Sequence, residues 1–158
     1  MSGLTLIPAT DAHFAWLLDE AEAPEGLTAP PGGIDEAWVF KWLRRTLPKL
    51  GGRGSWLMAA NGEVVGLCSY KVPPNVERSV EIGYGVAPER RRRGHATGGV
   101  TLLIEAARTD ERVDVLTAET ALANLPSQRA LIANGFADVG RGMDDDEGET
   151  IVWRLELG

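Results

Sequence analysis

The chain has 158 residues, 44% of them apolar and 25% charged, which is the balance of a single folded domain over residues 1–158. Its formal net charge of −7 argues against nucleic acid as the main partner, because contacts between cations and phosphates dominate that kind of binding. No apolar run is long enough to cross a bilayer, and neither a secretory signal nor a pair of cysteines is visible. We therefore expect a cytoplasmic protein that binds neither nucleic acid nor a membrane.

The first third of the chain is expected to form one strand and two helices. Residues 4–7 suit a short strand that ends at Pro8. Residues 11–22 carry apolar side chains at helical spacing, and a Pro- and Gly-rich loop follows at residues 23–34. A second helix should run from Asp35 to about residue 47 and end at the Pro-Lys-Leu-Gly-Gly sequence that comes next.

The middle of the chain predicts three strands in succession and then a helix. Residues 56–60 and 64–72 are apolar runs joined by an Asn-Gly pair, which is a strong hairpin signal. Residues 79–86 form the third strand after a Pro-Pro-Asn turn. Residues 95–108 carry apolar side chains at spacings of three and four, as one face of a helix requires.

The last third predicts further strand and helix segments. Residues 113–119 suit a strand, residues 127–134 a short helix, and the Gly-Phe pair after that helix starts a turn into another strand. The acidic sequence DDDEGE resembles an exposed hairpin loop before a closing strand at residues 150–157. This order of elements predicts an α/β sandwich, of the α+β kind, with a mixed sheet.

A basic, glycine-containing turn separates the strand at residues 79–86 from the helix at 95–108. Four arginines in a row are most simply a solvated charged surface. Directly before a helix, however, they lie beside amides that have no partner within the helix and therefore favour an anion such as pyrophosphate. Gly94 would let the backbone approach that anion closely. The turn lacks the Gly-Lys-Ser/Thr ending of a Walker loop and the glycine pattern of a dinucleotide fold.

The same turn carries a family resemblance. The sequence RRRGHA at residues 91–96 matches the (Gln/Arg)-x-x-Gly-x-(Gly/Ala) acyl-CoA loop of the GNAT superfamily of N-acetyltransferases, and Val-x-Pro at residues 86–88 precedes it. Residues 124–136 resemble the second signature of that family, Asn-x-x-Ser/Ala ending in Gly-Phe. The resemblance covers roughly residues 56–140 and is strongest to the branch that acetylates protein N-termini, especially those of ribosomal proteins.

The resemblance implies a mostly antiparallel mixed sheet flanked by helices, and direct transfer of an acetyl group from acetyl-CoA to a primary amine. The acceptor class that it favours first is a protein N-terminus, and the second is a small amine such as an amino sugar. No metal is implied. The sequence leaves the oligomeric state open, although the last strands could support a homodimer. The coenzyme-binding residues that it implies are Tyr84, Gly85, Val86, Arg91, Arg92, Arg93, Gly94, His95, Ala96, Thr97 and Asn124. A helix cap is the other interpretation of Asn124.

Two glutamates are candidates for the base that takes the proton of the amine. Glu119 lies five residues before Asn124, the spacing at which the N-terminal acetyltransferase branch carries its base. Glu81 lies on the strand at residues 79–86 and shares a face with Gly83 and Gly85 by strand alternation. Either carboxylate would otherwise be a solvated or ion-paired surface group. We prefer Glu119.

The acid that protonates the departing thiolate is harder to assign. Many relatives carry a tyrosine four residues before the Gly-Phe pair, and this chain has Leu131 there. Ser127 offers a hydroxyl near the same helix N-terminus, where it would otherwise serve as a helix cap. The departure at Leu131 favours another function, a non-catalytic acyl-CoA-binding sensor, and the basic loop leaves a nucleotide-binding module open as well.

The remaining candidates have structural interpretations. Cys68 lies in an apolar strand and is expected to be buried and unreactive. His13 and His95 lack the neighbouring ligands of a metal site. Trp38 and Trp42 are predicted to face the core, and the loop at residues 23–34 is expected to help choose the acceptor.

Overall fold

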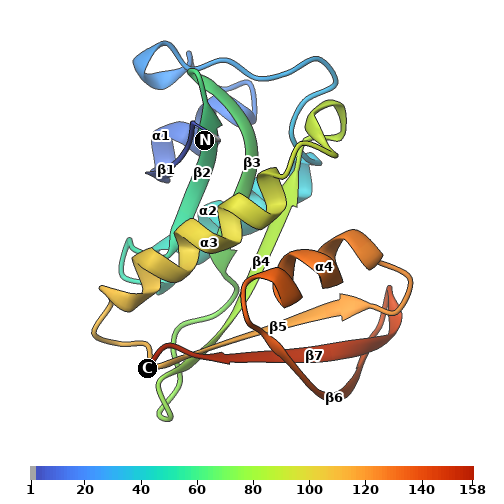
Figure 1. The fold of residues 1–158 in the computed structure, drawn as a ribbon. Coiled ribbons are helices and arrows are strands. Elements are labelled where there is room, and N and C mark those ends of the chain that lie inside the picture. Colours follow the sequence, from blue (N-terminus) through green and yellow to red (C-terminus); the bar gives the residue numbers. More distant parts are fainter. Residues whose placement is uncertain (1–2) are drawn as a thin grey trace.

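The structure, a computed structural model, describes residues 3–158 as one seven-stranded sheet with helices packed on it (Figure 1). Within these residues no helix is both long and apolar enough to span a membrane. The strands are β1 (Leu4–Pro8), β2 (Ser55–Ala60), β3 (Glu63–Tyr70), β4 (Ser79–Val86), β5 (Val115–Ala121), β6 (Ala137–Asp144) and β7 (Gly148–Glu156). The helices are α1 (Asp11–Leu17), α2 (Ala37–Lys49), α3 (His95–Arg108) and α4 (Leu125–Ala133), with short 3-10 turns η1 (Pro24–Gly26) and η2 (Pro88–Arg90).

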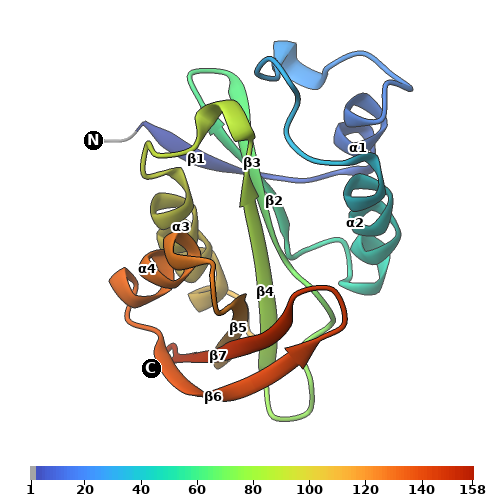
Figure 2. The same cartoon turned by 90° about the vertical axis from the view of Figure 1, so that its right-hand side faces the viewer.

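The sheet has the strand order β1-β2-β3-β4-β5-β7-β6, and β4 with β5 is its one parallel pair over residues 3–158. Helices α1 and α2 cover one face and α3 and α4 the other, as Figure 2 shows. The prediction of an α/β sandwich with a mixed, mostly antiparallel sheet is therefore confirmed.

Strand β4 shows how the two faces differ. Val80 and Ile82 are buried in the core beneath α3, which is the larger of the two apolar clusters. On the opposite face, Gly83 and Gly85 replace side chains, and their nearest neighbours on that side are the side chains of Lys71 and Asp35. The glycines keep the α2 face of β4 clear of its own side chains.

Strands β4 and β5 separate after three paired residues. Ser79, Val80 and Glu81 pair with Val115, Leu116 and Thr117, and the pairing stops there. Beyond that point β4 stays paired with β3 while β5 stays paired with β7, so the two strands diverge (Figure 1). We call the gap between residues 82–86 of β4 and 118–121 of β5 the β4–β5 fork.

The pairing of β4 with β3 decides which main-chain groups point into this fork. The Lys71 amide donates to the Glu81 carbonyl and the Ala87 amide to the Val65 carbonyl, each at 2.8 Å. Because hydrogen-bonded residues alternate along an antiparallel pair, odd-numbered residues of β4 bond to β3. The amides and carbonyls of Tyr84 and Val86 therefore point into the fork, where β5 has moved away.

Several element boundaries differ from those predicted. Helix α1 ends at Leu17 rather than at residue 22, because Asp19 adopts a left-handed backbone with φ of 61°. Helix α2 runs through Pro48 to Lys49, since a proline in the last turn removes only one helical hydrogen bond. Helix α4 begins at Leu125, two residues before the prediction, because Asn124 caps it.

Candidate active site

The loop between β4 and α3 has the backbone of an anion-binding site. Arg92 and Gly94 both adopt left-handed conformations, with φ of 65° and 79°. Helix α3 follows at once with 14 residues, and within residues 3–158 no side chain caps its N-terminus. The first amides of α3 are therefore left for an external acceptor, and the helix dipole adds partial positive charge there.

The four arginines of this loop differ in their hydrogen-bond partners. Arg90 binds Glu63 through two hydrogen bonds of 2.7 and 3.0 Å, which anchors η2 to β3. Arg91 donates to the Val86 carbonyl at 3.3 Å. Arg92 and Arg93 are exposed and remain the cations for phosphate groups.

His95, the first residue of α3, is half-buried next to these cations. Burial lowers the pKa of His95, and the positive charges of Arg93 and Arg90 lower it further. Its imidazole is therefore neutral at pH 7, and the positive charge of the loop comes from the arginines.

Gly94→Ala is expected to weaken coenzyme A binding about tenfold, because a left-handed conformation costs an alanine roughly 1–2 kcal/mol and the loop would relax away from it. Gly52→Ala is the matched control, since Gly52 has φ of 76° and equally open surroundings but lies between α2 and β2. Calorimetric titration with coenzyme A measures both variants. Equal affinity in the two would show that the loop does not bind the coenzyme.

On the α3 and α4 side of the fork, two hydroxyls meet. Tyr84 extends from β4 to the first turn of α4, where its hydroxyl lies 2.5 Å from Ser127 Oγ and donates to the Ser127 carbonyl at 3.2 Å. The Asn124 side chain accepts the Ser127 amide at 3.3 Å, so Asn124 is the helix cap that fixes this turn. Burial raises the pKa of Tyr84, an effect that the hydrogen bond from Ser127 partly offsets, so the phenol stays protonated at neutral pH.

Leu131, which replaces the usual tyrosine of the family, lies elsewhere. Its side chain is 0% exposed and packs in the apolar core with Phe136. The hydroxyl that the sequence did not reveal is that of Tyr84, which was predicted to bind the coenzyme but not to donate a proton. The signal was its position on β4, because alternation turns Tyr84 toward α4 while Gly83 and Gly85 face α2.

The two candidate bases lie on the opposite, α2 face of the fork. Glu81 belongs to the last paired position, opposite Thr117, and Glu119 lies two residues further along β5. Glu81 Oε2 accepts from Lys71 Nζ at 3.2 Å, whereas Glu119 Oε1 accepts from the Thr150 hydroxyl at 3.0 Å. Glu119 is exposed and borders the open part of the fork, while Glu81 lies at its closed end.

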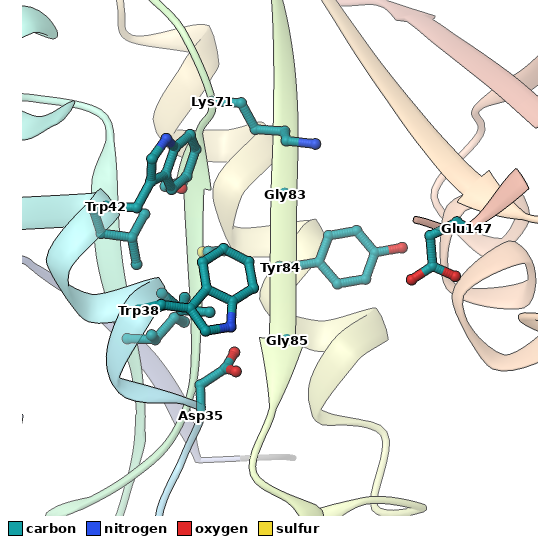
Figure 3. A pocket seen from close by; sticks show the side chains of 13 residues that line it. Asp35, Trp38, Trp42, Lys71, Gly83, Tyr84, Gly85 and Glu147 are labelled. Carbon is teal, nitrogen blue, oxygen red and sulfur yellow. The ribbon is translucent and has the colours of Figure 1, made fainter. Parts of the chain in front are cut away.

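A cavity of about 570 Å³ opens between α2 and β4 on this same face (Figure 3). Two indoles from α2, two carboxylates, one ammonium and the backbone of β4 form much of its wall. These lining residues are Trp38, Trp42, Asp35, Glu147, Lys71, Gly83, Tyr84 and Gly85. Neither Glu81 nor Glu119 is part of the wall, although Lys71 connects Glu81 to it.

The cavity contains residues that the sequence did not reveal as a site. Asp35 appeared as the start of a helix and Glu147 as part of an exposed hairpin loop. The prediction that Trp38 faces the core is wrong, because its side chain is 64% exposed and lines the cavity. Trp42 is half-buried: it packs against the apolar cluster under α2 and also lines the cavity.

The loop at residues 23–34 lies elsewhere on the molecule. The Thr28 amide donates to the Gly62 carbonyl at 3.0 Å, and the Thr28 carbonyl accepts the Val64 amide at 2.8 Å. The loop is thus held against the β2–β3 turn, and none of its residues lines the cavity.

A metal or a reactive thiol finds no support at the site. Residues 3–158 contain no group of three or more His, Cys, Asp or Glu side chains arranged to hold a metal ion. Cys68 is 1% exposed, as predicted, and burial raises the pKa of its thiol far above the ordinary value.

Comparison with known families identifies the arrangement of strands, loop and helix. A family model described as the acetyltransferase (GNAT) domain matches residues 3–137. The chain belongs to the GNAT acetyltransferase family. The resemblance of residues 91–96 and 124–136 to the GNAT signatures is therefore confirmed at the level of the family.

Solved structures agree with the GNAT fold. RimL, a ribosomal L7/L12 alpha-N-protein acetyltransferase in complex with coenzyme A, superimposes with a TM-score of 0.75 at 13% identity, over 99% of this chain and 95% of that one. RimJ of Mycobacterium smegmatis, in complex with CoA-disulfide, superimposes with a TM-score of 0.71 at 21% identity, over 97% of this chain and 81% of that one. A spermidine N-acetyltransferase SpeG chimera from Vibrio cholerae and hSSAT has a TM-score of 0.72 at 14% identity, over 99% of this chain and 96% of that one. No curated protein matches the chain by sequence.

Proposed function

We propose that this protein is an acetyl-CoA-dependent N-acetyltransferase that transfers the acetyl group directly to a primary amine, either a protein N-terminus or a small amine. The observation that carries the proposal is the β4–β5 fork. The fork leads directly into the anion-binding loop and has proton-exchanging side chains on both of its faces. Neighbours of the same fold are structures with coenzyme A or acetyl-CoA bound.

The chain offers a matching surface for the coenzyme. Tyr84 directs its main-chain amide and carbonyl into the fork, and Val86 its amide, and a pantetheine arm has amide groups that would pair with them as a strand does. Arg92, Arg93 and the uncapped amides of α3 would hold the pyrophosphate. By the same alternation Gly85 bonds to β3, so its contribution is the space that a missing side chain leaves.

The amine would enter from the α2 face. Its nitrogen forms a bond to the thioester carbonyl carbon, and the bond from that carbon to sulfur breaks. Glu119, directly or through one water, would take the proton that the amine loses, because its carboxylate borders the open fork. The main-chain amide of Val86 is positioned to stabilise the oxyanion that forms in between.

The leaving thiolate would take its proton from the α4 face. The hydroxyls of Tyr84 and Ser127 share a short hydrogen bond there, and they lie across the sheet from the cavity. A proton can pass from Tyr84 while Ser127 stabilises the resulting phenolate. This pair would supply the acid that Leu131 cannot.

A non-catalytic acyl-CoA sensor is the second candidate, and the burial of Leu131 at the position of the usual tyrosine favours it. A sensor would bind coenzyme A without releasing thiol, whatever amine is offered. Turnover therefore separates the two functions.

The test is thiol release from acetyl-CoA with N-terminal peptides, lysine peptides, polyamines and aminoglycosides, with mass spectrometry of the acetylated products. We expect stoichiometric thiol and N-acetyl product with at least one acceptor class. Thermal stabilisation by coenzyme A but not by ATP would separate the proposal from a nucleotide-binding module. Coenzyme A binding with no product from any amine would indicate the sensor, and no coenzyme A binding would refute both.

A further inference from the structure

We infer that the cavity between α2 and β4 selects acceptors with at least two amino groups, one held there as a cation while the other reacts. This inference rests on the proposed function, since it names the substrate class of the same site. The ligand chemistry is that of a small polyamine or amino sugar.

The aromatic wall is the first argument. Trp38 and Trp42 extend from α2 toward β4, and Trp38 leaves 64% of its surface in contact with solvent (Figure 3). The Trp38 indole is hydrogen-bonded on one edge, because its Nε1 donates to Glu36 Oε2 at 2.7 Å, which leaves the faces of the ring open. An exposed indole that lines a cavity of this size offers a face for an organic cation.

The charged side chains at the wall are mainly acidic. Asp35 comes from the segment before α2 and Glu147 from the turn between β6 and β7, so the carboxylates reach the cavity from different parts of the fold. Among the described residues that line the cavity, Lys71 is the only cation. Its Nζ lies 3.2 Å from Glu81 Oε2, and this ion pair offsets its charge. The cavity is therefore complementary to positive charge.

The Glu147 end is also the more acidic one. Hydrogen bonds from the Glu147 and Asp146 amides, with a smaller contribution from the Lys71 charge, lower the pKa of Asp144. The hairpin turn thus holds the ionised carboxylate of Asp144 close in sequence to Glu147, which lines the cavity.

The chemistry then requires two nitrogens. A carboxylate beside an ammonium group favours the charged form, but only a neutral amine attacks a thioester. A single amine bound at Glu147 would be held in its unreactive form. Asp35 Oδ2 lies 3.5 Å from the Cβ position of Gly85, so the Asp35 end of the cavity adjoins β4 at the fork. The anchored ammonium belongs in the cavity, at Glu147, and the reacting nitrogen in the fork, where Glu119 can take its proton.

The test compares acceptors of one length, 1,4-diaminobutane and 4-amino-1-butanol, which differ by one ammonium group. We expect kcat/KM to be at least about fivefold higher for the diamine. Glu147→Lys should abolish that preference, measured as the ratio of the two kcat/KM values. Glu156→Lys, at the far end of β7, has the same change in net charge and should keep the preference. Comparison of kcat/KM for an alkyl triamine and for an aminoglycoside then shows whether the acceptor is a polyamine or an amino sugar.

Calorimetric titration of the diamine without acetyl-CoA keeps the inference separate from the proposed function. Diamine binding that Glu147→Lys removes, with no turnover of any amine, would support the cavity assignment and refute the transferase. Equal kcat/KM for the two acceptors, or product from neutral peptides alone, would overturn the inference and leave the transferase intact. Absence of both diamine binding and diamine turnover would also overturn it.

Discussion

Glu119→Gln is expected to lower kcat/KM about 100- to 10,000-fold, because an amide cannot take the proton that the attacking amine must lose. Its fold should be unaffected, since Gln Oε1 can still accept the hydrogen bond that the Thr150 hydroxyl donates to Glu119 at 3.0 Å. Steady-state thiol release with the best acceptor measures the loss, and coenzyme A affinity should stay at the wild-type value.

Glu81→Gln is the matched control for this prediction. Glu81 shares the α2 face with Glu119, but it lies at the closed end of the fork and its carboxylate is paired with Lys71. We expect a loss of less than about tenfold. If Glu81→Gln abolishes turnover and Glu119→Gln does not, the base lies on β4 and the assignment of Glu119 is wrong.

Tyr84→Phe is expected to lower kcat about 10- to 100-fold with little change in KM, because it removes the hydroxyl that would protonate the leaving thiolate. Burial raises the pKa of Tyr84 above that of an ordinary phenol, so its donor role should persist through the neutral and mildly alkaline range. The wild-type kcat should therefore show no loss from this group between pH 7 and 9.

Two variants separate this role from a structural one. Tyr70→Phe also removes a buried tyrosine hydroxyl. That hydroxyl lies outside the fork, where it donates to Asp110 at 3.2 Å, so kcat should be unchanged. Ser127→Ala should lower kcat less than Tyr84→Phe, because Tyr84 keeps its bond to the Ser127 carbonyl. If Tyr84→Phe raises KM for acetyl-CoA without changing kcat, Tyr84 orients the coenzyme and does not donate the proton.

The fold and the anion-binding loop were accessible from the sequence because their signals are local. The Asn-Gly hairpin, the glycine before α3 and the alternation along β4 each act over a few residues. The order of elements and the position of the loop between β4 and α3 were predicted correctly for that reason. Helix ends were less accurate, since a cap such as Asn124 or a left-handed Asp19 moves a boundary by several positions.

The acceptor cavity was not accessible, because it depends on contacts between distant segments. Asp35 and Glu147 line one cavity only once β6 and β7 extend the sheet beyond β5, and nothing local marks either as a cavity residue. The pairing of Arg90 with Glu63 is equally non-local, and it removes one of four similar arginines from the loop. The Tyr84–Ser127 contact needs the fork itself, which periodicity does not reveal.

Amide hydrogen exchange, resolved by residue with and without coenzyme A, tests most directly whether the β4–β5 fork binds the thioester. The account predicts new protection at the Tyr84 and Val86 amides and in the first turn of α3. The Gly83 and Gly85 amides should not change, because they already bond to β3. Coenzyme A binding that leaves Tyr84 and Val86 unprotected, or that protects a different strand edge, would contradict the account.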